Sequence, residues 1–124
     1  MTACGDMFVV IERGRVALID TYEGTLLDVA PSYEEFKLAL QSQESLGRWF
    51  MPDLIVALRQ IGLTLSEGQC YSPKIHPVLG GEMVPANFEA TNWLVHFYVL
   101  GQIYEQVRKL PPGTRLSGVD IQWK

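Results

Sequence analysis

The chain has 124 residues, of which 48% are hydrophobic and 19% are charged, and its formal net charge at pH 7 is −4. This length suits one domain with a single buried core, and this composition excludes a disordered or fibrous protein. Binding to nucleic acid or to an acidic membrane generally needs a basic surface, which the net charge argues against.

Targeting signals are also missing from the sequence. No apolar run approaches the roughly 18 residues of a membrane span, and the amino terminus lacks the pattern of a secretory signal peptide. The two cysteines, Cys4 and Cys70, fit reduced thiols better than a disulfide framework. We therefore expect a cytoplasmic protein whose first residues, 1–6, are frayed.

The first elements in the chain are predicted strands. Three apolar segments rich in β-branched residues follow one another within residues 7–31, separated by short breaks that contain glycine. The segments are 7–12, 15–20 and 25–30, with the breaks at Arg13-Gly14 and Glu23-Gly24. This pattern predicts a three-stranded antiparallel meander. The first two segments are apolar almost throughout, which is typical of inner strands covered on both faces.

Two helices are predicted after the meander. Ser32 followed by Glu35 is a capping-box pattern, so a short helix should begin here and end before Gln41. Pro52 suits the first position of another helix, which Gly62 should end. The segment between them, residues 44–50, is ambiguous.

The most regular helical pattern lies at residues 92–109. Most of its apolar residues fall on one arc of the helix, together with His96, whereas residues such as Gly101 and Glu105 fall on the other side. We interpret His96 as a hydrogen-bonded core residue. Leu94 and Tyr98 lie on the polar side. They are either covered by the preceding Pro-rich segment, which we favour, or exposed to a partner.

The end of the chain completes the predicted fold. Val119, Ile121 and Trp123 alternate with polar residues, a period of two that predicts a half-buried strand joining the meander. The expected fold class is therefore α+β: a single domain over residues 1–124, with one mostly antiparallel sheet and helices packed on it.

Catalytic motifs are mostly absent. The best candidate is a Cys70 nucleophile with His76 as its base and Asn87 orienting the imidazole. We favour the alternative that Cys70 is a buried apolar residue and His76 a loop residue. The spacing of histidines and cysteines matches no zinc pattern, so we expect no metal, no cofactor and no enzyme activity.

Several segments carry a resemblance to a known family. They are Gly68–Tyr71, Lys74–Glu82 (KIHPVLGGE), Val95–Phe97 and Gly101–Ile103, with Ser32–Phe36 as a weaker point of similarity. In these segments the chain resembles the C-terminal domain of type VI secretion DNase-immunity proteins and, more loosely, the SUKH immunity superfamily. We interpret the matching positions as residues that maintain the fold. They include Cys70, Tyr71, Lys74, His76, Pro77, Gly80, Gly81, His96 and Gly101.

The resemblance implies a non-catalytic protein, a monomer or homodimer, that neutralises a polymorphic toxin such as a nuclease by binding it. Acidic residues would then meet a basic toxin surface, with an apolar anchor beside them. The candidates are Glu34, Glu35, Glu44, Asp53, Glu82, Glu89, Leu94 and Tyr98. Two other readings stay open: a homo-oligomeric interaction domain and a cryptic Cys-His enzyme. Direct contact with nucleic acid or membrane is not expected.

Overall fold

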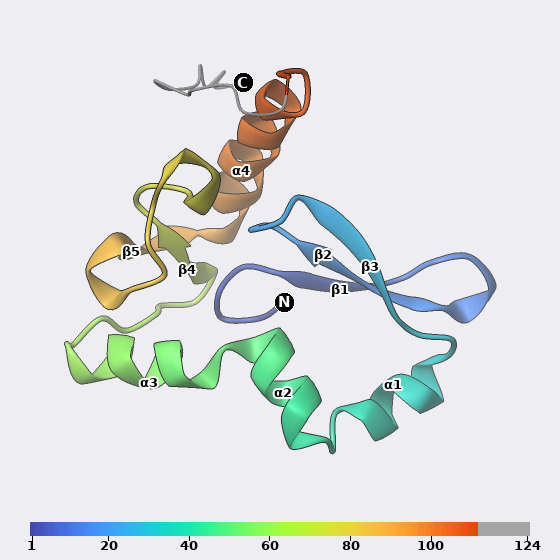
Figure 1. The fold of residues 1–124 in the computed structure, drawn as a ribbon. Coiled ribbons are helices and arrows are strands. Elements are labelled where there is room, and N and C mark those ends of the chain that lie inside the picture. Colours follow the sequence, from blue (N-terminus) through green and yellow to red (C-terminus); the bar gives the residue numbers. More distant parts are fainter. Residues whose placement is uncertain (112–124) are drawn as a thin grey trace.

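The computed structural model describes residues 1–111, which form two antiparallel sheets and four α-helices (Figure 1). Three helices follow one another along one side of the molecule, and the fourth rises from the smaller sheet on the opposite side. The α+β prediction is confirmed. The predicted strand at Val119–Trp123 lies outside the described residues.

The larger sheet is the predicted meander, with strands β1 (Met7–Val10), β2 (Val16–Asp20) and β3 (Thr25–Ala30) in that order. The expectation that the first two strands are both inner strands is wrong for β1. Because β1 pairs only with β2 in the described chain, it is an edge strand, and its Val10 is 65% exposed.

Three short helices cover one face of this meander and the start of the second sheet. They are α1 (Tyr33–Ala39), α2 (Gln43–Phe50) and α3 (Pro52–Gln60). The predicted cap is present, since the Ser32 hydroxyl accepts a hydrogen bond from the Glu35 backbone N–H at 3.2 Å. The ambiguous segment 44–50 is helical because Ser42 caps it in the same way.

The first hydrophobic core lies between the meander and helices α1 and α2. Phe36 and Trp49 are buried in it, and the partly buried Phe8 packs on both, with its ring centroid 4.8 Å from Phe36 and 5.5 Å from Trp49. Val16 and Leu18 on β2 are almost fully buried against the same group. This core attaches the meander to the helical layer.

The second sheet was not predicted. Strands β4 (Gln69–Pro73) and β5 (Phe88–Asn92) pair with each other and not with the meander. The described chain therefore has two sheets instead of one. One face of this pair packs on α3, where Leu58, Tyr71 and Phe88 form a separate buried core. The Pro/Gly-rich segment before the long helix, residues 74–87, is therefore the connection between two paired strands.

The long helix α4 spans Trp93–Val107, which confirms the predicted helix to within two residues at each end. The Asn92 side chain caps it by accepting from the Leu94 N–H at 2.9 Å. His96 is 1% exposed, as expected for the buried arc. The expectation that Leu94 and Tyr98 are covered is wrong, since they are 59% and 39% exposed.

The amino-terminal residues are ordered by contacts with both sheets. The expected fraying of residues 1–6 is contradicted, because Thr2, Cys4 and Asp6 are only 3%, 0% and 5% exposed. The Ala3 carbonyl accepts a hydrogen bond from the Tyr71 N–H at 2.7 Å, which places this segment beside β4. Residues 1–6 thus contribute to the junction between the two sheets.

Candidate partner-binding site

A groove of about 440 Å³ opens between α4 and the β4–β5 pair. Ser72 and Glu89 are partners in the strand register, so their side chains share the face that α4 crosses. We call this hollow the α4 groove. Its walls are mostly apolar, and its charged lining residues are Lys74 and Glu89. The apolar lining includes Ile75, Leu79, Val95, Val99, Leu100 and Ile103.

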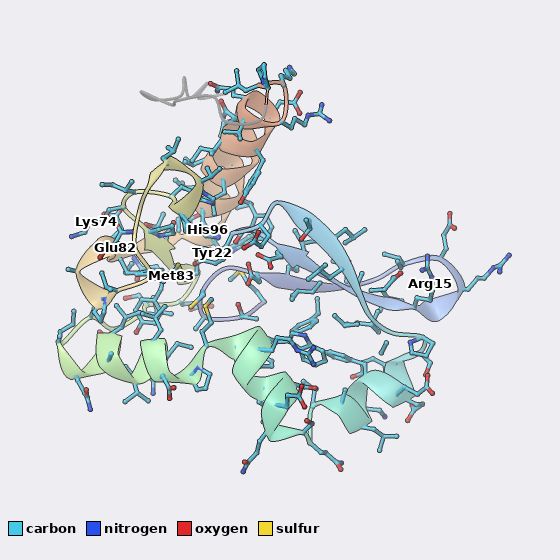
Figure 2. The ribbon with its side chains drawn as sticks, in the orientation of Figure 1. Arg15, Tyr22, Lys74, Glu82, Met83 and His96 are labelled. Carbon is cyan, nitrogen blue, oxygen red and sulfur yellow. The ribbon has the colours of Figure 1, made fainter. Side chains whose placement is uncertain are left out.

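A chain of buried hydrogen bonds lies behind the α4 groove and reaches it at Ser72 and His96. The Thr21 hydroxyl donates to Asp6 Oδ1 at 2.7 Å, so it must accept from His96 Nε2 at 3.1 Å. That places a proton on Nε2. Because burial lowers the pKa of His96 to about 4 and keeps the ring neutral, Nδ1 accepts from the Ser72 hydroxyl at 2.8 Å. Figure 2 shows His96 beside Tyr22 at this junction of the two sheets. The imidazole is thus neutral and held on both sides.

Thr21 also holds the second histidine. His76 Nε2 donates to the Thr21 carbonyl at 3.1 Å, and His76 Nδ1 accepts from the Val78 N–H at 3.1 Å. Thr21, directly after β2, thereby joins the amino-terminal segment, α4 and the loop after β4. His96 extends these contacts to Ser72 on β4. We call Asp6, Thr21, Ser72, His76 and His96 the Thr21 network.

Burial sets the protonation states in this network. It lowers the pKa of His96 to about 4, with a further contribution from the neighbouring His76, and it lowers the pKa of His76 as well. It raises the pKa of Asp6 to about 6, against the two hydrogen bonds from Thr21 that favour the carboxylate. Near neutral pH both imidazoles are therefore uncharged and Asp6 is ionised.

The structure separates the proposed Cys70, His76 and Asn87 constellation into three different roles. Cys70 is completely buried, and burial raises the pKa of its thiol to about 11. His76 has no ring nitrogen left to accept a proton from it. The Asn87 side chain binds the backbone of Ile75 and the Glu82 carbonyl. These contacts fit the structural alternative favoured for Cys70.

A different nucleophile-like pair was missed from the sequence. Ser72 and His96 share a hydrogen bond at the floor of the α4 groove, but only 5% of Ser72 and 1% of His96 is exposed. An enzyme nucleophile must reach its substrate, whereas this hydroxyl is directed into a buried network. No sequence signal marks the pair, because β4 was not recognised as a strand.

The loop between β4 and β5 carries the remaining motif residues. Pro77 begins a 3₁₀ turn at Pro77–Leu79, which ends at Gly80 with a φ of 93°. A Cβ atom at Gly81 would collide with the Ile75 carbonyl oxygen, so only glycine allows this close approach. Gly101 lies elsewhere, on the exposed side of α4, where it lines a second hollow of about 300 Å³ beside the meander.

The predicted acidic residues do not form one cluster. Glu89 lines the α4 groove, whereas Glu82 lines a neighbouring hollow together with Lys74. Figure 2 shows Lys74 and Glu82 together at the outer side of this loop. The other acids are in the first turns of the helices on the opposite side of the molecule. They are Glu34 and Glu35 on α1, Glu44 on α2 and Asp53 on α3.

The match to known families covers this site. A family model described as T6SS immunity protein Tdi1, C-terminal, matches residues 30–104, which is more than half of the chain. The chain belongs to this family. The Tdi1 C-terminal match spans helices α1 to α3, both strands of the second sheet and most of α4, so it contains all the residues that line the α4 groove. Comparisons with curated proteins and with solved structures found no match.

Two further findings concern the described part of this Tdi1 family member. None of its helices within residues 1–111 is long and apolar enough to cross a membrane. Within the same residues, histidine, cysteine and acidic side chains form no group of three or more that could hold a metal ion.

Proposed function

We propose that this protein is a cytoplasmic immunity protein that neutralises a type VI secretion toxin, such as a nuclease, by binding it without catalysis. The observation that carries the proposal is the position of the α4 groove. It is an open, mainly apolar surface within the part of the chain that belongs to the Tdi1 C-terminal family. An open apolar groove with exposed apolar neighbours is typical of a protein-binding surface.

The state of the reactive side chains supports binding over catalysis. Cys4 and Cys70 are fully buried, and burial raises the pKa of both thiols, so neither is a ready nucleophile. Both histidines use both ring nitrogens in hydrogen bonds within the protein. In the described chain, every buried polar side-chain atom has a hydrogen-bond partner.

We place the toxin on the α4 side of the molecule. Leu94 and Val95, in the first turn of α4, are 59% and 37% exposed, and Tyr98 one turn later is 39% exposed. Val95 also lines the α4 groove, so these residues extend its apolar surface. The acids on α1, α2 and α3 lie on the opposite side and are explained by helix capping and dipole interactions.

Paired arginine substitutions test this placement. Leu94→Arg should weaken binding of the toxin encoded beside the gene by tenfold or more, because a charge replaces an apolar contact and would face a basic toxin surface. Leu38→Arg is the matched control, since Leu38 is 64% exposed on α1. Affinities would be measured by isothermal titration calorimetry. Equal affinities of the two variants would refute this face as the binding surface.

A further inference from the structure

The α4 groove has an uneven distribution of polar groups. Its floor includes Ser72 and His96, but these two side chains already satisfy each other and Thr21. They offer little to an incoming polar group. The walls formed by α4 and by the loop after β4 are apolar, with Val95 37% and Ile75 55% exposed. A ligand would therefore meet an apolar channel through most of the groove.

Glu89 is the exception. It lies on β5 at the edge of this channel, its side chain is exposed, and it forms no ion pair with another residue of the described chain. Lys74 also lines the groove, but Figure 2 shows it directed to the outer side of the loop, where it shares a hollow with Glu82. The groove thus combines an apolar channel with one unpaired carboxylate.

This combination fits a long basic side chain. The aliphatic part of arginine or lysine packs on apolar surface while its charged end stays at the edge, and a carboxylate there forms a charge-assisted hydrogen bond. The volume of about 440 Å³ lies in the range of about 300–1,000 Å³ that is typical of ligand-sized clefts. It leaves room for the residues next to such a side chain.

We propose that the α4 groove receives a basic side chain of the toxin, with its aliphatic part along Val95 and Val99 and its charged end at Glu89. This inference rests on the proposed function, since the toxin supplies the side chain. It assigns Glu89 to recognition and leaves Glu82, which does not line the groove, outside the contact.

A matched pair of neutral substitutions tests the assignment. Glu89→Gln should weaken binding of the neighbouring gene's toxin by about tenfold to a hundredfold and reduce the salt dependence of the association rate. Glu82→Gln removes the same charge a short distance away and should change the affinity less than twofold. Surface plasmon resonance over a salt series would measure both.

A second variant tests the channel itself. Val99→Phe should fill part of the groove and weaken binding by at least tenfold, with unfolding by urea showing whether the variant is still folded. If Val99→Phe does not fold, Glu89→Gln alone decides the proposal.

The outcomes separate this inference from the proposed function. If the wild type binds the toxin and Glu89→Gln binds equally well, the groove assignment is wrong and the proposed function stands. If the wild type does not bind the toxin, the proposed function fails and this inference fails with it. If Val99→Phe instead abolishes a dimer and leaves toxin affinity unchanged, the groove joins two copies of this chain, and the proposal is overturned.

Discussion

At the scale of single residues, folding shifts the pKa values of Asp6 and His96 in opposite directions. The native pKa of Asp6 is about 6 against an ordinary 3.8, so between those values the native state binds a proton that the unfolded chain releases. This makes the free energy of unfolding fall as pH rises. The native pKa of His96 is about 4 against 6.5, so the unfolded chain binds the extra proton and stability rises with pH.

Between about pH 4 and 6 the effects of Asp6 and His96 on the free energy of unfolding oppose each other. A variant without one of these groups should therefore show the effect of the other. Asp6→Asn keeps an oxygen to accept the hydrogen bonds from Thr21 but cannot titrate. Its free energy of unfolding should therefore rise with pH more steeply than that of the wild type, by up to about 1.4 kcal/mol per pH unit. Urea unfolding across this range would measure both slopes, and parallel curves would contradict the account.

Ser72 tests whether the buried network has a chemical role. Ser72→Ala removes the donor to His96 Nδ1 and leaves a buried acceptor unpaired, which should cost about 1–3 kcal/mol of stability. The folded variant should still neutralise the toxin, because the proposed mechanism is binding and does not use this hydroxyl as a nucleophile. A folded Ser72→Ala protein that no longer neutralises toxin would indicate that the hydroxyl acts directly.

At the scale of elements, α4 carries two kinds of leucine. Leu100 is 3% exposed and lines both the α4 groove and the second hollow beside the meander. Leu94 is 59% exposed. Leu100→Ala should lower the free energy of unfolding by about 2–5 kcal/mol. Leu94→Ala should change it by less than about 0.5 kcal/mol. Equal denaturation midpoints would contradict the orientation of α4.

The helices could be predicted because their signals are local. The Ser32–Glu35 cap, Pro52 and the apolar arc of α4 each lie within a few turns of chain, and the structure has all three. Strands β4 and β5 were missed because each is short, β4 ends in Pro73, and 14 residues separate them. Only their pairing, which sequence periodicity does not contain, defines them as a sheet.

The candidate site was less predictable than the fold for the same reason. The sequence pointed to Glu89, Leu94 and Tyr98, but nothing in it joined Thr21 to His96, which are 75 residues apart in the chain. The supports of the groove also come from outside the family match, since Asp6 and Thr21 precede residue 30. Such long-range contacts exist only after the two sheets have met.

At the scale of the whole molecule, a polar junction joins two hydrophobic cores. The meander with α1 and α2 forms one core, and β4, β5 and α3 form the other. The Thr21 network lies between them, and three of its members, Ser72, His76 and His96, line the α4 groove. The surface proposed to meet the toxin is therefore shaped by contacts from both parts of the chain.

The most direct test of the central claim is a titration of the toxin's activity with this protein. Neutralisation by binding predicts that activity falls linearly and reaches zero near one protein per toxin, and that denaturing separation returns chemically intact toxin. Toxin inactivated by far less than one equivalent, or recovered cleaved or modified, would show that the protein is an enzyme. Full toxin activity at a large excess of the protein would contradict neutralisation itself.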